Sequence, residues 1–297
     1  MELTKRAAIV GVTGFVGSGL PALLAEIGMA TTGISRAGRG SVPGVDRWQT
    51  PETLDFTGHH AVINLAGEPI DQRWNDDTRR RFHESRVGVT TRVVEAIAKI
   101  PEGQRPAVLV NASAVGIYGD RGDEILTDTA RPGRGYLAEL CNDWEDAARD
   151  AETIGIRVVR LRIGIVLGTN GSAFEKLRRV FKLGLGGPLG HGKQWMPWIH
   201  LADLRAAIVH AVMSETLTGP VNTSAPNPER NADLTRKLAA ALHRPAILPV
   251  PGFALKLVLG GFGGALLTGQ RALPAALEAD GFRFRFPTLE AALADLV

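Results

Sequence analysis

Three glycines near the N-terminus have the spacing of a phosphate-binding turn. The chain reads R-A-A-I-V over 6–10, G-V-T-G-F-V-G over 11–17 and S-G-L-P-A-L-L over 18–24. Gly11 permits a tight turn after an apolar strand, Gly14 lets the backbone approach a pyrophosphate, and Gly17 lets the next helix pack close to the strand. The start of that helix offers free N–H groups to phosphates. The segment predicts a dinucleotide site that includes Thr13, Phe15 and Val16.

The end of the next expected strand, residues 30–34, indicates which dinucleotide binds. An NAD site usually carries an acidic residue there, roughly 20 residues past the glycines, to bind the ribose 2′-hydroxyl. No Asp or Glu occurs between Glu26 and Asp46, and Ser35 and Arg36 stand at that point, with Arg39 close behind. A guanidinium and a hydroxyl suit a 2′-phosphate. The sequence therefore favours NADP(H), with solvated loop charges as the alternative interpretation of the two arginines.

Short apolar strands alternate with helices through the first two-thirds of the chain. Strands are expected over 61–65, 107–112 and 157–161, and helices over 76–99 and 136–153. This alternation is typical of a parallel sheet covered on both faces, so we predict an α/β fold with a Rossmann-type doubly wound sheet.

The pattern changes after Gly168. A Gly- and Pro-rich loop spans 183–197, a helix is expected to open at 198–204, a strand at 220–223 and another helix at 231–243. We predict a nucleotide-binding domain over 1–170. A smaller substrate-side lobe would follow over 171–297, with segments that return to the sheet.

Composition limits the function classes. The net charge is only +3 and the basic residues are dispersed, so no nucleic-acid partner is expected. The single cysteine, Cys141, excludes an internal disulfide, and the seven histidines lack metal-ligand spacing. Strand-like residues begin at once, so no signal peptide and a cytoplasmic location are expected.

One apolar stretch needs a separate interpretation. Residues 252–269 are interrupted by Lys256 and several glycines, which is too short an apolar run to span a bilayer. We expect a packed helix pair there and no membrane partner; a membrane-surface or partner-facing role is the alternative.

Several segments together resemble the extended short-chain dehydrogenase/reductases. More narrowly, they are similar to an atypical branch of "epimerase family" proteins, often labelled nucleoside-diphosphate-sugar epimerases. The segments are the glycine turn, Arg36, N-L-A-G-E (64–68), R-W (73–74), S-R (85–86), N-A-S-A-V-G-I-Y-G (111–119), C-N-D-W-E (141–145), G-L-G-G-P-L-G-H-G-K-Q (184–194), W-I-H (198–200) and Q-R-A-L-P (270–274).

The resemblance implies a Rossmann fold, an NADP(H) site and further cofactor contacts. Leu65, Ala66 and Gly67 would lie beside the adenosine, Arg86 would approach the phosphates and Val166 would lie near the nicotinamide-side ribose. From the residues alone, Arg86 is equally well explained as a surface charge on a helix.

The catalytic residues implied by the resemblance are incomplete. Extended reductases use Ser, Tyr and Lys, with the lysine four residues after the tyrosine; the tyrosine exchanges a proton while hydride moves. Ser113 matches the serine region, but a turn or cap hydroxyl is an equal alternative. Tyr136 is the candidate acid, yet Leu140 stands at the lysine position. Without the lysine its pKa would be near 10, poorly matched to neutral catalysis. The alternative is that Tyr136 is a half-buried helix residue with a solvated hydroxyl.

Other side chains have two interpretations each. Cys141 is a reactive thiol or a small core residue, and His200 with Asp203 is a base–carboxylate pair or the start of a helix. Substrate contact or simple packing explains a further set equally well: Glu68, Trp74, Gln194, Trp195 and Trp198.

Two functions follow. The first is an NADP(H)-dependent oxidoreductase or epimerase that acts on a small or nucleotide-linked substrate. The second is a non-catalytic NADP(H)-binding redox sensor or partner-binding protein, because the lysine is missing from an otherwise intact cofactor domain. The oligomeric state is left open.

Overall fold

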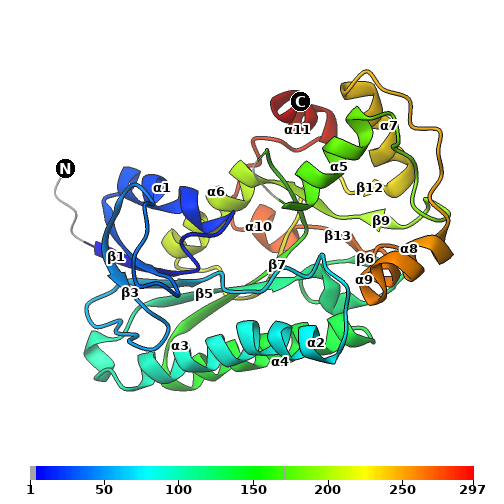
Figure 1. Cartoon of the computed structure of the whole chain (residues 1–297). Coiled ribbons are helices and arrows are strands. Elements are labelled where there is room, and N and C mark those ends of the chain that lie inside the picture. Colours follow the sequence, from blue (N-terminus) through cyan, green and yellow to red (C-terminus); the bar gives the residue numbers. More distant parts are fainter. Residues whose placement is uncertain (1–4, 170–171) are drawn as a thin grey trace.

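A parallel β-sheet forms the centre of the computed structural model, which describes residues 5–169 and 172–297 (Figure 1). Its seven strands run in the order β11-β7-β5-β4-β1-β2-β3. They are β1 (Lys5–Val10), β2 (Met29–Ile34), β3 (Val45–Gln49), β4 (Ala61–Asn64), β5 (Val108–Ala114), β7 (Arg157–Ile163) and β11 (Gly219–Thr223). The order reverses between β1 and β4, and ligands of such sheets bind at the carboxyl ends of the strands beside that point. The predicted Rossmann-type fold is confirmed.

Helices cover both faces of the sheet. Ala7 and Ile9 of β1 pack with α1 (Leu20–Glu26) and α6 (Leu201–Met213), which lie above the sheet in Figure 1. Ala8 and Val10 point the other way and pack with α3 (Val89–Ala98) and α4 (Tyr136–Arg149). Because successive side chains of a strand face opposite sides, one apolar strand serves two cores.

The helix expected over residues 76–99 is not uniform. It consists of α2 (Asp76–His83), a π-helical turn η2 (Glu84–Gly88) and then α3. Such π-turns occur often at functional sites, because they change the direction of side chains within a helix. This one carries Ser85 and Arg86.

Two elements beyond residue 170 belong to the main sheet or its covering layer. Strand β11 pairs with β7, and α6 packs against the sheet next to α1. A domain boundary near residue 170 stays a prediction. The prediction of a helix from Trp198 was wrong: Trp198–His200 form β10, which pairs with β8 (Ile165–Leu167), and α6 begins at Leu201.

Smaller elements complete the chain. They are η1 (Gly17–Gly19), η3 (Glu102–Gln104), η4 (Val115–Tyr118), β6 (Ile125–Leu126), η5 (Asp150–Ile154), α5 (Ser172–Lys182), β9 (Trp195–Met196), β12 (Glu229–Arg230), α7 (Asn231–Ala241), α8 (Gly252–Leu259), α9 (Gly261–Ala265), β13 (Arg271–Ala272), α10 (Ala275–Ala279) and α11 (Leu289–Leu296). Helices α8 and α9 form the helix pair expected over 252–269. Within residues 5–169 and 172–297, every helix is too short or too polar to cross a bilayer.

Candidate functional site

The glycine-rich turn follows β1 at the switch point of the sheet. Gly11 has φ +82°, and a Cβ atom there would lie 3.2 Å from the Leu65 carbonyl oxygen. A Cβ on Gly17 would lie 2.5 Å from the Gly11 carbonyl oxygen, closer than atoms can approach. The turn therefore requires glycine at both positions, for backbone conformation at the first and for close packing at the second.

The turn leaves backbone donors without acceptors. The amide of Gly14 donates to the Gly11 carbonyl (3.0 Å) and that of Ser18 to the Gly14 carbonyl (3.0 Å). Across the described residues, no acceptor is found for the amides of Phe15 and Val16. Thr13 beside them is exposed. These free N–H groups in one turn can bind an anion such as a pyrophosphate.

Arg205 of α6 holds this turn from a distant part of the chain. Its Nη2 donates to the Phe15 carbonyl (2.7 Å) and its Nε to the Val16 carbonyl (2.9 Å). With these two carbonyls bound to the guanidinium, the loop is fixed in the shape that leaves its amides free. No local pattern identifies Arg205 from the sequence, because it lies 190 residues from Phe15.

The end of β2 carries a cationic edge. Ser35 Oγ donates to the Arg39 carbonyl (3.0 Å), which closes a short loop. The side chains of Arg36 and Arg39 are exposed, and neither pairs with a carboxylate in the described parts of the chain. Both guanidiniums are thus free for a 2′-phosphate, the group that the sequence predicted at this point.

The loop after β4 lies against the glycine turn. The Leu65 amide donates to the Val10 carbonyl (3.0 Å), and the Ala66 amide to Asn64 Oδ1 (3.2 Å). Asn64 is fully buried, and its Nδ2 donates to Asn111 Oδ1 (2.7 Å). These bonds bring Leu65, Ala66 and Gly67 to the carboxyl edge of the sheet, where the family resemblance expects them.

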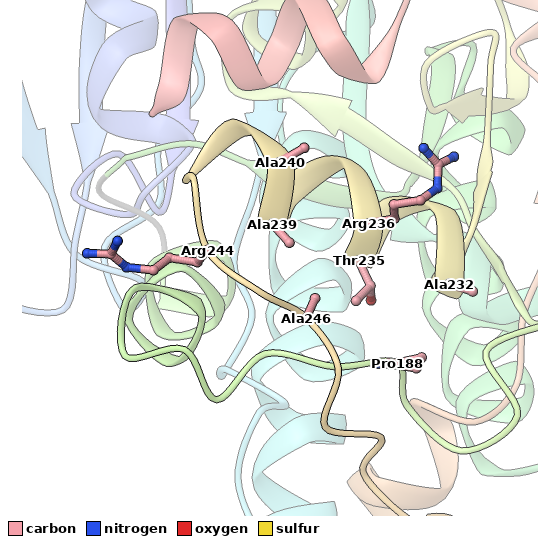
Figure 2. Close-up of a pocket in the computed structure, with 8 residues that line it drawn as sticks. All are labelled: Pro188, Ala232, Thr235, Arg236, Ala239, Ala240, Arg244 and Ala246. Carbon is pink, nitrogen blue, oxygen red and sulfur yellow. The ribbon is translucent and has the colours of Figure 1, made fainter.

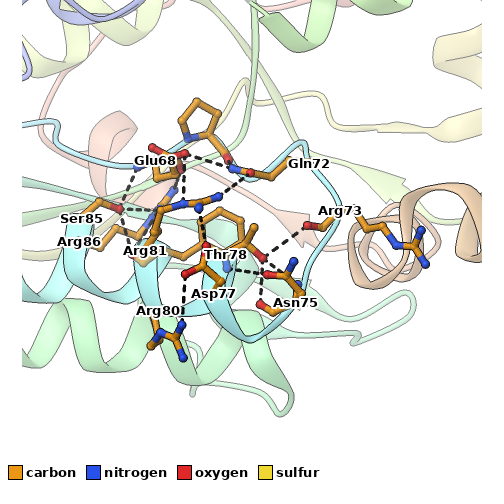
Figure 3. Close-up of polar contacts among 12 residues, drawn as sticks. Glu68, Gln72, Arg73, Asn75, Asp77, Thr78, Arg80, Arg81, Ser85 and Arg86 are labelled. Atoms are coloured by element: carbon orange, nitrogen blue, oxygen red, sulfur yellow. Dashed lines mark hydrogen bonds and ion pairs between the residues drawn. The ribbon is translucent and has the colours of Figure 1, made fainter.

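Arg86 lies beneath that loop rather than on the protein surface (Figure 3). Its Nη2 donates to the Glu68 carbonyl (2.9 Å), and its guanidinium lies 5.3 Å from the centre of the Trp144 ring. Burial lowers the pKa of Arg86. A Cβ on Gly67 would lie 3.2 Å from Arg86 Cζ, so the loop rests directly on the cation. The interpretation of Arg86 as a surface charge on a helix is therefore wrong. Its contact with cofactor phosphates stays a prediction.

Ser85, beside Arg86 on the π-turn, ties the same loop to the helix. Its Oγ accepts from the Glu68 amide (2.9 Å) and donates to the Phe82 carbonyl (3.2 Å). Figure 3 shows this group together with Gln72 and Arg81, which also reach toward Glu68. The serine and the arginine of the S-R segment therefore act together to position the backbone of residues 67 and 68.

The end of β8, which carries Val166, is joined to the glycine turn by one aromatic contact at Gly168. Val166 is half-buried, and Gly168 follows it closely. A Cβ on Gly168 would lie 2.8 Å from Phe15 Cζ, so the Phe15 ring packs on this segment. The structure thus brings together three predicted parts of the cofactor site: the glycine turn, the loop after β4 and the end of β8.

Ser113, the predicted catalytic serine, is part of a buried ionic network. It is 2 % exposed, and its Oγ donates to Glu145 Oε1 (2.8 Å). Arg162 donates to the same carboxylate through Nε (2.7 Å) and Nη2 (2.9 Å). Burial opposes the charge of Arg162, but the Glu145 carboxylate more than offsets it and raises the pKa of that guanidinium. The geometry favours a structural hydroxyl, and a catalytic role for Ser113 stays a prediction.

The same network continues away from the sheet edge. Arg162 Nη1 donates to Tyr118 Oη (2.9 Å), and that hydroxyl donates to Asn222 Oδ1 (2.6 Å). Burial raises the pKa of Tyr118. Buried charges of this kind are tolerated only when they are paired. The pairing therefore fixes the side chains that β5, α4, β7 and β11 contribute to this network.

Tyr136 begins α4 and sits among aromatic and basic side chains. Its ring makes an edge contact with Trp74 (5.3 Å between centres), and the Arg79 guanidinium lies 4.7 Å from its centre. Burial raises the pKa of its hydroxyl, although Arg79 and Arg86 oppose this. Leu140, at the lysine position, is buried. Among the described residues, the cations that act on the Tyr136 hydroxyl are the guanidiniums of Arg79 and Arg86 rather than a lysine.

Cys141 is a core thiol. It is 4 % exposed, and burial raises its pKa to about 12, with the Glu145 carboxylate adding to the effect. A thiol with such a pKa is almost entirely protonated at neutral pH and is a poor nucleophile. This supports the interpretation of Cys141 as a small core residue.

His200 and Asp203 do not form a base–carboxylate pair. His200 Nδ1 accepts from the Ala202 amide (3.1 Å) and caps α6, whereas Asp203 accepts from the amides of Arg285 (2.8 Å) and Phe286 (2.9 Å). Asp203 lies in the first turn of α6, as predicted, and its carboxylate also fixes the segment before α11. The cap is the histidine.

The remaining pocket candidates divide into two places. Trp74 and Glu68 lie on the loop before α2, and Trp74 also packs on Phe262 of α9 at 6.3 Å. Trp198 is fully buried, while Gln194 and Trp195 line a pocket of about 240 Å³ together with Asp123 and Arg230. In the described parts of the chain, no cluster of three or more His, Cys, Asp or Glu side chains has metal-site geometry.

The fold and the glycine-rich turn with free amides are those of the Rossmann-type class. The chain belongs to the NAD dependent epimerase/dehydratase family, which matches residues 7–222, and residues 250–296 match a domain of unknown function, DUF1731.

Relatives in distant organisms match almost the whole chain. The epimerase family protein SDR39U1 homolog of Arabidopsis thaliana, named chloroplastic, is 37% identical over 98% of this chain and 86% of its own length. The epimerase family protein YfhF of Bacillus subtilis is 35% identical over 98% of this chain and 97% of its own. A cytoplasmic location for this chain stays a prediction.

A solved structure shows the same fold with a cofactor. The crystal structure of human epimerase family protein SDR39U1 with NADPH aligns with a TM-score of 0.89 at 33% identity, covering 98% of each chain.

Proposed function

We propose that this protein binds NADPH along the carboxyl edge of the sheet and uses it to reduce a small molecule. The observation that carries the proposal is that two anion-binding groups occur at this edge: the free amides of the glycine turn, and Arg36 and Arg39 at the end of β2, which pair with no carboxylate in the described residues. A dinucleotide that carries a 2′-phosphate presents one anion to each of these places. The human relative that was crystallised with NADPH supports the same cofactor.

Each predicted residue then has a binding role. The turn from Gly11 to Gly17 binds the pyrophosphate, with Arg205 fixing its shape, and Ser35 and Arg36 bind the 2′-phosphate. The backbone of residues 65–67 borders the adenosine, and Val166 borders the nicotinamide side. When bound, the nicotinamide supplies a hydride.

The protonation step limits the substrate class. Burial raises the pKa of Tyr136 and Leu140 replaces the lysine that would lower it, so a tyrosinate base is disfavoured at neutral pH. Sugar epimerisation needs such a base to remove a hydroxyl proton. We therefore favour net reduction of an electron-poor acceptor, whose reduced form takes its proton from water.

The surroundings of Tyr136 indicate an apolar substrate wall. The Trp74 ring lies between two other aromatic rings, with its centre 5.3 Å from that of Tyr136 and 6.3 Å from that of Phe262. Arg79 stacks on the tyrosine at the outer side. Such a wall suits a planar or apolar acceptor with an anionic or electron-rich edge.

A non-catalytic NADPH sensor is the second candidate. The observation that favours it is the buried position of Ser113, whose hydroxyl is committed to Glu145, together with the protonated thiol of Cys141. Of the two predicted catalytic hydroxyls, Ser113 and Tyr136, only that of Tyr136 is not enclosed.

Cofactor titration followed by turnover tests both candidates. NADPH and NADH are titrated by fluorescence into wild type, Arg36→Ala and the exposed control Arg47→Ala. We expect NADPH to bind with a micromolar or lower Kd, to bind at least about tenfold more weakly to Arg36→Ala, as expected for loss of a charge-assisted hydrogen bond, and to bind unchanged to Arg47→Ala. No binding of either nucleotide would overturn both candidates. Binding with no NADPH oxidation across quinones, enones and aldehydes would favour the sensor.

A further inference from the structure

Exposed apolar side chains are concentrated on one part of the surface. Of the twelve large apolar residues that are exposed in the described chain, eight lie in the two short segments 180–185 and 247–258. Phe253, Leu257 and Ile247 are each at least 75% exposed, which is unusual for such side chains. We call this set the apolar face: Val180, Leu183, Leu185, Ile247, Leu248, Phe253, Leu257 and Val258.

The segments that carry the apolar face lie side by side. Arg244 Nε donates to the Lys182 carbonyl (3.0 Å), and the Val250 amide donates to the Pro188 carbonyl (2.9 Å). Leu189 and Val250 form an isolated parallel bridge, and α8 begins directly afterwards. Residues far apart in the sequence thus lie on adjoining segments, and eight exposed large apolar side chains on two adjoining segments differ from the scattered single exposures normal for proteins.

The same segments contain no acidic residue. Asp and Glu are absent from 176–202 and from 234–277, although the chain has 31 of them. Lys182, Arg244 and Lys256 are exposed and pair with no carboxylate in the described residues. Within α8, Phe253, Lys256 and Leu257 follow at helical spacing and share one outward stripe.

An open depression of about 450 Å³ borders the apolar face along α7 (Figure 2). Its lining is mostly alanine and proline, and Figure 2 shows Arg236 and Arg244 at opposite ends with their guanidiniums turned outward. Arg236 pairs with Asp233 (3.1 Å), whereas Arg244 pairs with no carboxylate in the described residues. An apolar floor with Arg244 at its margin suits acyl groups below and a phosphate above.

We propose that the apolar face binds the surface of an anionic lipid bilayer. Phe253, Leu257 and Ile247 enter the boundary between headgroups and acyl chains, while Lys182, Arg244 and Lys256 remain at the level of the lipid phosphates. A surface contact needs only such a stripe, so the short apolar run that excludes a membrane-spanning helix does not oppose it.

The positive charges beside the apolar face favour an anionic bilayer as the partner over a second copy of this chain. Two copies that met through this face would bring Lys182, Arg244 and Lys256 of each close to those of the other, with no carboxylate in either segment to neutralise them. An anionic surface complements all three cations at once. It also accommodates side chains from both segments without a matching groove.

Vesicle flotation tests the proposal with the full chain. Wild type is mixed with vesicles of phosphatidylcholine alone or with one-third phosphatidylglycerol, at low and high salt. We expect binding to the anionic vesicles only and its loss at high salt. Phe253→Ser with Leu257→Ser, and separately Arg244→Glu with Lys256→Glu, are expected to lower partitioning at least about tenfold.

Matched controls keep folding defects apart from lost binding. Met213→Ser removes an exposed apolar side chain elsewhere, and Arg47→Glu with Lys99→Glu reverses two exposed charges elsewhere. Both should partition like wild type, and all variants should keep the wild-type melting temperature within a few degrees. Absence of binding to anionic vesicles, or equal loss in the controls, would overturn the proposal. Two other results would also overturn the proposal. One is a dimer of this chain that the Phe253 and Leu257 changes abolish, with no binding to vesicles. The other is binding of an acidic protein by this face in place of lipid.

Discussion

Ser113→Ala separates a structural hydroxyl from a catalytic one. The substitution removes a buried 2.8 Å hydrogen bond to the Glu145 carboxylate, which keeps its two bonds from Arg162. A hydrogen bond to a charged group contributes about 1.5–3 kcal/mol, and the remaining bonds place this one near the lower end. We expect the free energy of unfolding to fall by about 1.5 kcal/mol, or about 3–6 °C in melting temperature at about 2–4 °C per kcal/mol.

Ser224→Ala is the matched control for this measurement. Ser224 is fully buried, and its Oγ donates to the neutral Ala272 carbonyl (3.1 Å), so its removal should cost about 1 kcal/mol or less. Urea unfolding and NADPH titration are measured on both variants. The structural reasoning is refuted if Ser113→Ala unfolds like wild type while turnover of an identified substrate falls a hundredfold or more, about 2.7 kcal/mol in the barrier.

Three further predictions concern the cofactor turn and pH. Arg205→Ala should weaken NADPH binding by about tenfold or more because the Phe15 and Val16 carbonyls lose their donors; Arg92→Ala, which breaks only an exposed ion pair with Glu84, should leave the NADPH Kd unchanged in the same titration. Gly17→Ala should abolish NADPH binding, since its Cβ would lie 2.5 Å from the Gly11 carbonyl oxygen, whereas Gly103→Ala, with no atom within 4 Å, should bind normally. Burial lowers the pKa of His59 in the folded protein, so protonation favours the unfolded chain. Its contribution to stability is complete above the ordinary histidine pKa near 6.5 and is lost as pH falls below it; urea midpoints between pH 7 and 5 should fall less steeply in His59→Gln, and an equal slope would contradict this assignment.

The sequence by itself determined the features that depend on neighbouring residues. Apolar strands, the glycine turn after the first of them and the missing acid after the second are local signals, because backbone conformation and side-chain periodicity act over a few residues. They sufficed to predict the doubly wound sheet, and they are the basis on which a cofactor site around Gly11 and Arg36 is predicted. The π-turn at Ser85 and Arg86 escaped this reasoning, because its residues keep an ordinary helical pattern.

Only the tertiary structure decided what the polar side chains contact. The bonds from Arg205 to Phe15, from Ser113 to Glu145 and from Asp203 to Arg285 join residues that periodicity cannot relate. The same holds for the apolar face, where segments 180–185 and 247–258 meet because Val250 pairs beside Pro188. Burial and pairing depend on the packed chain as a whole. They direct the predicted catalytic serine toward a buried carboxylate, and they leave apolar side chains from two distant segments on one surface.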